Sequence, residues 1–138
     1  MNVVAWSPHL TRERADAAGV DFASQKADLF KKADIVSVHM VLSNETHHLI
    51  TQSDLSLMKS SAFIINTSRG PLIEESALIK VLEDKSIAGA GLDVFDVEPL
   101  PINHPLRSLP NVTLTPHLGY VADDAYKVVA LTCNGNLL

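Results

Sequence analysis

Residues Ala62–Val94 have the sequence AFIINTSRGPLIEESALIKVLEDKSIAGAGLDV, and this stretch decides the fold. Ala62–Asn66 and Ala88–Val94 are short apolar runs bounded by turn residues, which predicts two buried strands. Glu74–Asp84 predicts an amphipathic helix between them, because its apolar residues share one stripe with charges opposite. These apolar residues are Ala77, Leu78, Val81 and Leu82. A strand, a crossing helix and a second strand predict a parallel β-α-β unit.

The same alternation continues on both sides of this unit. Further strands are predicted at Asn2–Trp6, Ile35–His39 and Asn111–Thr115, with a weaker one at Val20–Phe22. Helices are predicted at Arg12–Ala18, Gln25–Lys32, Thr51–Lys59 (capped by Thr51 or Ser53) and Val121–Leu131. The strands lack strict polar alternation, which is typical of strands covered on both faces. We therefore expect an α/β fold with a doubly wound parallel sheet.

The composition is that of one ordinary globular domain, with 46% hydrophobic and 20% charged residues among 138. The net charge of −5, with scattered Lys and Arg, gives no reason to expect a nucleic-acid partner. No apolar run approaches the roughly 20 residues that span a bilayer, so no membrane association is expected. Cys133 is the sole cysteine, which favours a reducing compartment. We therefore expect a cytoplasmic protein.

Several chemically useful side chains follow the predicted strands, at the edge where parallel sheets bind ligands. They are Ser7, His39, Thr67, Ser68, Arg69, Asp93 and His117. Arg69 can hold a carboxylate through two parallel hydrogen bonds. His117 can transfer a proton near neutral pH. Glu98 belongs to the proline-rich segment Phe95–Pro110, which we expect to be an ordered surface loop rather than a helix. Taken alone, each of these residues is more often a solvated surface group.

Taken together, these residues resemble the D-2-hydroxyacid dehydrogenase family. The matching segments are NTSRGPLIEESAL (Asn66–Leu78), AGAGLDVFDVEP (Ala88–Pro99), LTPHLGY (Leu114–Tyr120) and VSVHMVLSNETHHLI (Val36–Ile50). The resemblance covers nearly all of residues 1–130, with the motifs in the family's order. It implies a Rossmann-like dinucleotide-binding domain and hydride transfer between NAD or NADP and a small 2-keto or D-2-hydroxy acid. It does not indicate which acid.

The resemblance also implies catalytic roles. Arg69 would hold the carboxylate and carbonyl oxygen of the substrate, and His117 would be the general acid/base. Glu98 would orient His117 and favour its charged form. Hydride would reach the carbonyl carbon while His117 protonates the oxygen.

Cofactor contacts are implied for a larger set, which is Val41, Thr46, Thr67, Ser68, Arg69, Asp93, His117 and Gly119. Asp93 would accept a hydrogen bond from the nicotinamide carboxamide. The alternative for Asp93 is a strand-end aspartate that binds a neighbouring backbone N–H. Val41 departs from the proline common at its position, although valine keeps an apolar contact with adenosine.

The glycine-rich loop that holds the pyrophosphate in this family is a larger departure. The only G-x-G is Gly89-Ala90-Gly91, which lies in a predicted strand and has no helix after it. Close packing within the sheet explains these glycines better. We therefore expect residues 1–138 to be part of a dinucleotide-binding domain, without its first strand and glycine loop and without the substrate domain. Such a fragment or truncated product would have little activity by itself.

Ser7 is the second departure, because NAD-selective members carry an acidic residue there for the ribose hydroxyls. Serine removes the charge that would repel a 2′-phosphate, and Arg12 or Arg14 could contact one. This widens the expected cofactor to NAD or NADP. Equally, both arginines could simply face solvent on their helix.

Other functions remain open at this stage. Corepressors on the same fold sense dinucleotides and keep the catalytic set that corresponds to Arg69, Glu98 and His117, so a non-enzymatic binding protein is the alternative. The resemblance implies a homodimer, to which about Leu100–Leu109 could contribute. No metal site is expected, because His9, His39 and His104 lack ligand spacing. His47 and His48 would point apart on a helix.

Overall fold

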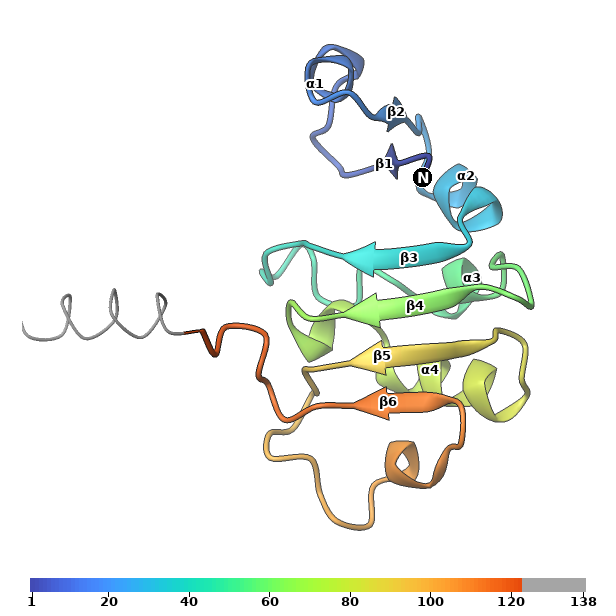
Figure 1. Cartoon of the computed structure of the whole chain (residues 1–138), viewed down its shortest axis with the longest axis vertical. Helices are drawn as coiled ribbons and strands as arrows, with labels where there is room; N and C mark the ends of the chain where they lie inside the picture. Colours follow the sequence, from blue (N-terminus) through green and yellow to red (C-terminus); the bar gives the residue numbers. More distant parts are fainter. Residues whose placement is uncertain (123–138) are drawn as a thin grey trace, which may run out of the picture.

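The computed structural model describes residues 1–122 as alternating strands and helices (Figure 1). The strands are β1 (Val4–Ala5), β2 (Asp21–Phe22), β3 (Ile35–Val38), β4 (Phe63–Asn66), β5 (Gly89–Leu92) and β6 (Val112–Leu114). The helices are α1 (Arg12–Ala17), α2 (Lys26–Lys32), α3 (Gln52–Leu55) and α4 (Glu75–Glu83). Short 3-10 turns follow as η1 (Gly70–Leu72) and η2 (Pro105–Ser108). As far as β6, the predicted order of strands and helices is confirmed, including the weak strand at Val20–Phe22, which is observed at Asp21–Phe22.

Every strand pair in the described part is parallel. Strands β3, β4, β5 and β6 form one sheet in sequential order, and β1 pairs with β2 in a separate one. Figure 1 shows β1 on the side of the small sheet that faces β3. Within residues 1–122 β1 and β3 are not paired, and no strand is hydrogen-bonded between them. In the larger sheet the carboxyl ends of all strands lie at one edge, which collects the residues that follow them.

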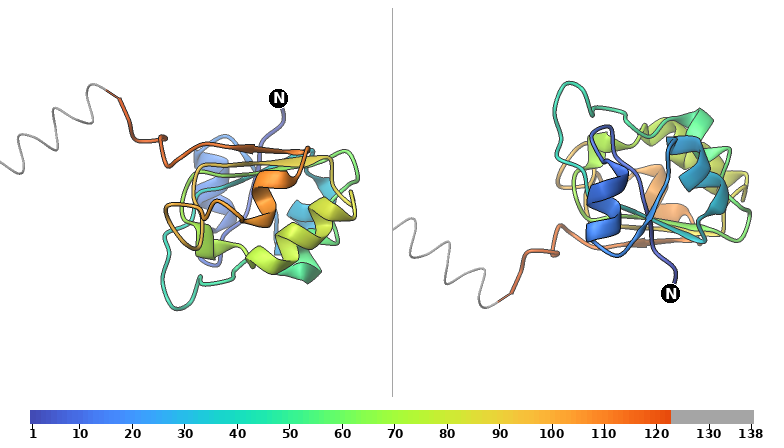
Figure 2. Two further views of the ribbon diagram at one scale, coloured as in Figure 1. Left: turned by 90° about the horizontal axis from the view of Figure 1, so that it is seen from below. Right: turned by 90° about the horizontal axis from the view of Figure 1, so that it is seen from above.

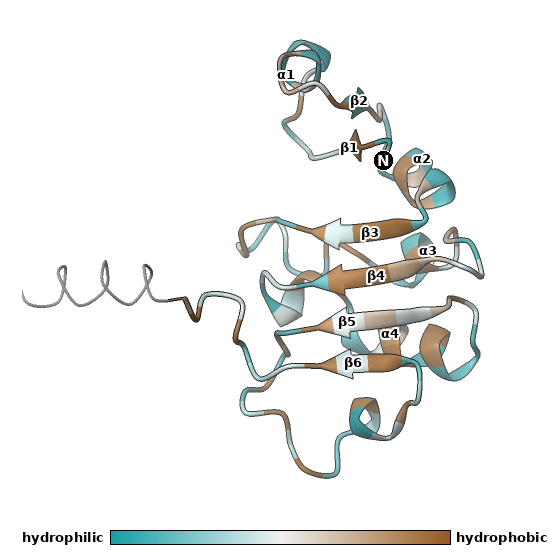
Figure 3. Ribbon diagram, in the orientation of Figure 1, coloured by the Kyte–Doolittle hydropathy of each residue, from teal (hydrophilic) through white to brown (hydrophobic). Residues whose placement is uncertain are grey.

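The core lies between the larger sheet and the helices on one of its faces. The predicted stripe of α4 is buried there, with Leu78 and Leu82 3% and 1% exposed. From the sheet, Val36 and Ile64 enter the same apolar cluster. The edge-on views of Figure 2 show α4 and η2 on the same side of the strands, and Figure 3 shows the apolar strands themselves. Burial of these side chains is the main force that holds α4 on the sheet.

The other face of the sheet differs from the expectation of strands covered on both sides. In β3 the residues alternate between exposed and buried. Ile35 and Phe63 share that open face, paired in register, and are 59% and 46% exposed. Their apolar character produced the pattern of a fully covered strand, but within residues 1–122 these two side chains remain about half exposed.

Two sequence expectations need adjustment, and a third lies outside the described residues. The helix expected at Thr51–Lys59 is shorter; Thr51 does precede it, and its N–H donates to Asp54 Oδ2 at 2.9 Å. The expected loop Phe95–Pro110 contains the 3-10 turn η2, because Pro105 is tolerated at a helix start. The helix predicted at Val121–Leu131 lies almost entirely outside the described residues, as does Cys133.

Two further observations concern the glycines and the helices. Gly89 and Gly91 lie within β5, as predicted, and Ile65 lies against Gly91. No helix among residues 1–122 is long and apolar enough to cross a membrane.

Candidate active site

The turn after β4 presents Arg69 at the carboxyl edge of the sheet. Asn66, the last residue of β4, is 1% exposed. Its Oδ1 accepts the Ser68 N–H at 3.0 Å, and its Nδ2 donates to the Arg69 carbonyl at 2.8 Å. The Ser68 hydroxyl donates to the Val38 carbonyl at 2.8 Å, which ties the turn to the end of β3. The Arg69 side chain is exposed, with Nη1 donating to the Ser68 carbonyl at 2.6 Å.

The loop after β5 carries Glu98. Its Oε1 accepts the Phe95 N–H at 3.0 Å, which fixes the carboxylate close to the end of β5. The Arg69 turn packs directly on this loop, because Gly70 has no space for a side chain against the backbone of Phe95 and Asp96. The two segments that carry Arg69 and Glu98 are therefore in backbone contact.

The turn after β6 carries His117, whose backbone adopts a φ of 58°. Its Nδ1 lies 2.8 Å from Glu98 Oε2, with the two side chains 30% and 36% exposed. The hydrogen bond from His117 holds the pKa of Glu98 below its ordinary value, with smaller contributions from the Phe95 N–H and the nearby Arg69 charge. Glu98 is therefore an ionised hydrogen-bond partner for His117 near neutral pH.

Asp93 connects the end of β5 to the His117 turn. Its Oδ1 accepts the Leu118 N–H at 2.8 Å and the Thr115 hydroxyl, and its Oδ2 accepts the Gly119 N–H at 2.7 Å. Burial alone would raise the pKa of Asp93, but the hydrogen bonds outweigh burial and lower it. The alternative of an aspartate that binds backbone N–H groups is therefore observed.

These turns surround a cleft of about 410 Å³. It is lined by Thr67, Arg69, Asp93, His117, Gly119 and Tyr120. Tyr120 was missing from the expected site, although it ends the LTPHLGY motif; its ring meets that of His117 edge-on, with centroids 5.3 Å apart. A carboxylate oxygen has two acceptor positions. Within residues 1–122 Asp93 Oδ2 accepts one hydrogen bond, from the Gly119 N–H, which leaves its second acceptor position at the cleft.

The remaining expected cofactor residues lie outside this cleft. Ser7 follows β1 and is half-buried, whereas Val41 follows β3 and is 82% exposed. Thr46 is buried and closes its own loop: its hydroxyl donates to the Val41 carbonyl at 2.6 Å and accepts the Ser43 N–H at 2.8 Å. These positions are compatible with a ligand that extends along the carboxyl edge of the strands.

The expected geometry of His47 and His48 was wrong. They lie in a turn rather than a helix, and their ring centroids are 4.0 Å apart. His48 has a φ of 51°, which interrupts any helix at that point. Even so, residues 1–122 contain no group of three or more His, Cys, Asp or Glu arranged to hold a metal ion.

Comparisons with known proteins agree on one family. The family model for the D-isomer specific 2-hydroxyacid dehydrogenase NAD binding domain matches residues 1–119. A glyoxylate reductase of Thermofilum pendens is 47% identical over 110 residues, which are 80% of this chain and 32% of that protein.

Two solved structures show the same relationship. The NAD-complexed D-isomer specific 2-hydroxyacid dehydrogenase of Lactobacillus delbrueckii ssp. bulgaricus is 31% identical with a TM-score of 0.83, over 98% of this chain and 44% of that one. The enzyme of the same description from Xanthobacter autotrophicus Py2, in complex with NADPH and MES, is 40% identical with a TM-score of 0.69, over 72% and 33%.

The chain spans less than half of the length of each of these relatives. The match of the family model to residues 1–119 covers most of the chain, and the parallel Rossmann-like architecture agrees with it. The chain belongs to the NAD-binding-domain family of the D-isomer specific 2-hydroxyacid dehydrogenases.

Proposed function

We propose that this chain forms part of an NAD(P)-dependent enzyme that interconverts a small 2-keto acid and a D-2-hydroxy acid. The observation that carries the proposal is the pair of His117 and Glu98, 2.8 Å apart, at a cleft that Arg69 also lines. A 2-keto acid has a carbonyl group next to a carboxylate. A histidine paired with a carboxylate can protonate that carbonyl oxygen, and a nearby guanidinium can bind the carboxylate.

In the reducing direction, His117 gives a proton to the carbonyl oxygen of the substrate. Arg69 holds the substrate carboxylate and stabilises negative charge on that oxygen. Glu98 keeps the imidazole in place and balances its charge. The nicotinamide cofactor, when bound, supplies or accepts the hydride. Thr67 and the free acceptor position of Asp93 would hold its nicotinamide end.

The same proposal includes the domain organisation. We infer that these residues form part of a dinucleotide-binding domain whose first strand and glycine loop lie elsewhere, as does the substrate domain. The division of the sheet between β1 and β3 supports this inference. So does the position of Gly89 and Gly91 inside β5, where they cannot cradle a pyrophosphate.

Catalysis is favoured over the corepressor alternative. The relatives described above are a reductase and two dehydrogenases, by their names. No feature of the cleft distinguishes a dinucleotide sensor.

A test of the function compares the whole enzyme that contains this chain, here called the active enzyme, with its Arg69→Ala variant. The substrates are glyoxylate, hydroxypyruvate and pyruvate. We expect reduction of at least one acid, and a KM raised about 10- to 100-fold in the variant. That range corresponds to a lost charged hydrogen bond of about 1.5–3 kcal/mol. The matched control is Arg107→Ala, which removes an arginine outside the cleft and should leave KM unchanged. An unaltered KM in Arg69→Ala would contradict the assignment of Arg69.

Cofactor choice gives a second prediction. Ser7 provides no charge to repel a 2′-phosphate, and Arg14 reaches the turn after Ser7, with Nη1 donating to the His9 carbonyl at 3.4 Å. Arg12 lies over the ring of Phe22, 5.4 Å from its centroid. We therefore expect the enzyme to use NADP(H) as well as NAD(H), with Ser7→Asp shifting the preference toward NAD(H). Values of kcat/KM for both cofactors check this. A strong NAD(H) preference that Ser7→Asp does not change would place selectivity at other residues.

We also propose a homodimer in the cytoplasm. Part of the apolar segment Leu100–Leu109 is unavailable to a partner, because Leu100 and Leu106 are only 8% and 1% exposed. Ile102 is 93% exposed and is the better candidate for a contact. Sedimentation should therefore show a dimer that Ile102→Asp weakens. A wild-type enzyme that sediments as a monomer at assay concentration would refute this proposal.

A further inference from the structure

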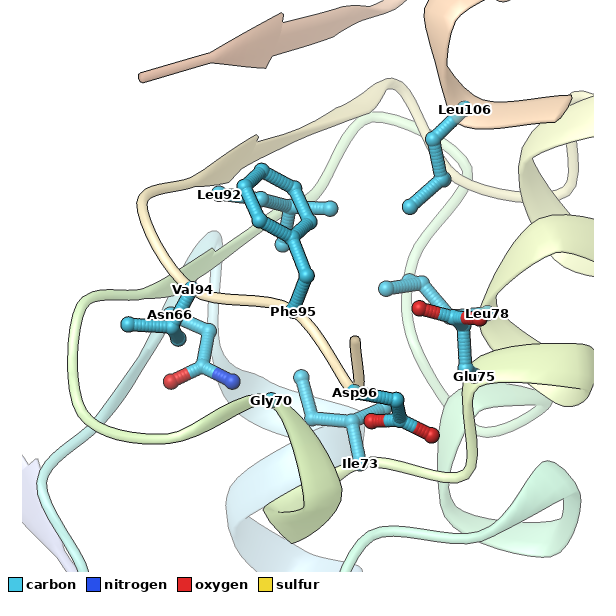
Figure 4. Close-up of a pocket in the computed structure, with 10 residues that line it drawn as sticks. All are labelled: Asn66, Gly70, Ile73, Glu75, Leu78, Leu92, Val94, Phe95, Asp96 and Leu106. Atoms are coloured by element: carbon cyan, nitrogen blue, oxygen red, sulfur yellow. The ribbon is translucent and has the colours of Figure 1, made fainter. Parts of the chain in front are cut away.

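Asn66 is the only fully buried side-chain amide that contacts the Arg69 turn in the described part of the chain. It does not line the cleft, and it was not among the residues expected at the site. Figure 4 shows it on the inner side of the loop that leads into Gly70, with its amide end directed toward that loop. A buried polar group of this kind has a free energy cost unless its hydrogen bonds are made.

The bonds of Asn66 account for both ends of its amide. Its Oδ1 accepts the Ser68 N–H, and its Nδ2 donates to the Arg69 carbonyl. These two groups stand at the two ends of the Ser68–Arg69 backbone, whose torsion angles set the direction of the Arg69 side chain. Asn66 is the last residue of β4, so its amide fixes the turn to the hydrogen-bonded sheet.

The Arg69 side chain has little support of its own. It is exposed, and its Nη1 donates to the adjacent Ser68 carbonyl, within the same turn. The direction in which the guanidinium leaves the sheet therefore depends on the backbone of Ser68 and Arg69. Arginine recognises a carboxylate through a planar fork, so its affinity is sensitive to that direction.

We propose that Asn66 is a positioning residue for substrate binding: its buried amide sets the backbone of the Arg69 turn and so aims the guanidinium into the cleft. The proposal rests on the proposed function for the identity of the ligand, a 2-keto acid carboxylate. It predicts that Asn66 affects the affinity for the acid and does not affect the affinity for the cofactor.

The test uses Asn66→Ala and Asn66→Asp in the active enzyme, with oxamate as an unreactive analogue of a 2-keto acid. In Asn66→Ala we expect the dissociation constant of oxamate to rise about 10- to 100-fold, the range expected for the loss of one hydrogen bond to a charged group. Cofactor affinity should be little changed. The matched control is Asn111→Ala, which removes another amide-to-carbonyl bond, from Asn111 Nδ2 to the Leu82 carbonyl at 3.1 Å. Asn111 lies just before β6, at the end of the strand opposite the carboxyl edge that holds the cleft.

Asn66→Asp keeps the shape of the side chain and the acceptor for the Ser68 N–H, so it tests the donor bond if the alanine variant does not fold. An ionised carboxylate repels the Arg69 carbonyl, whereas a protonated one can donate to it. The loss of oxamate affinity relative to wild type should therefore shrink as the pH falls. A loss that is constant with pH, or equal to that of Asn111→Ala, would overturn the proposal.

A measurement without ligand separates this proposal from the proposed function. Hydrogen exchange of the Ser68 amide should be slow in wild type and in Asn66→Asp, and faster in Asn66→Ala. If wild type binds no 2-keto acid but the Ser68 amide behaves as expected, the function is wrong and the positioning role of Asn66 in the turn stands. An unchanged Ser68 exchange rate in Asn66→Ala refutes that role, whatever the enzyme binds.

Discussion

Replacing His117 with alanine should lower kcat by about two to four orders of magnitude, the usual contribution of a general acid/base. His117 faces the cleft, and its Nδ1 is engaged by Glu98. Because Nδ1 is turned toward Glu98, the other ring nitrogen is the one available for the carbonyl oxygen. Alanine removes that proton donor and leaves no histidine among the residues that line the cleft. Steady-state kinetics with saturating cofactor measure the effect, and binding of oxamate should persist because Arg69 is intact.

The control for this variant is His9→Gln, which removes an exposed histidine from the turn before α1. It should keep the turnover of wild type. A His117→Ala enzyme with near-normal turnover on every acid tested would show that the proton comes from elsewhere.

The dependence of activity on pH adds a second check on the pair. The pKa of Glu98 is lowered in the folded chain, chiefly by the hydrogen bond from His117. The stability that the pair adds is therefore present above the ordinary glutamate pKa of about 4.3 and is lost only as pH falls through the lowered value. Above about pH 5, Glu98 should thus stay ionised, and kcat/KM should show no step from its protonation.

The architecture could be predicted because the relevant signals are local. The stripe of Leu78 and Leu82 predicts α4, and the short apolar runs predict the strands that the helix crosses between. The length of α3 was less predictable. Leu57 and Met58 donate to carbonyls three residues back, so the chain tightens into turns beyond Leu55 even though its composition still suits a helix.

The sequence motifs predicted which residues belong to the site, but they did not predict the contacts between these residues. The resemblance carried Arg69, Glu98 and His117, but their mutual contacts depend on which strands are neighbours. The hydrogen bonds of Asp93 join residues 25 and 26 positions apart, and no local pattern encodes such partners. For the same reason the sequence left both roles of Asp93 open. Coverage of the second sheet face could not be decided either, because an apolar residue looks the same whether or not anything packs on it.

Gly70→Ala should have the second large effect, on stability and activity together. A methyl group at Gly70 would overlap the carbonyl of Phe95 and lie 2.6 Å from the amide nitrogen of Asp96. Both neighbours are backbone, so they cannot rotate away as a side chain would. We expect a loss of about 1–3 kcal/mol in the free energy of unfolding, the usual result of forcing extra atoms into a packed core. Urea denaturation measures this loss.

Gly91→Ala is the matched control, because its added methyl group would meet only the terminal carbon of Ile65, at 3.0 Å. That carbon is the end of a flexible side chain and can move by rotation. Gly91→Ala should therefore retain most of the stability and activity of wild type. Equal stabilities for the two variants would mean that the Gly70 contact yields more easily than its geometry implies.

The activity loss in Gly70→Ala should exceed what the loss of stability explains. Gly70 is where the turn carrying Arg69 touches the loop carrying Glu98, so separating the two backbones changes the position of the substrate carboxylate relative to His117. A displacement of about 1 Å between such groups costs on the order of 100-fold in rate. Measured on folded protein below the unfolding transition, kcat/KM should fall by about that factor. A folded variant with normal kcat/KM would show that the Arg69 turn and the Glu98 loop adjust independently, and that their contact serves folding alone.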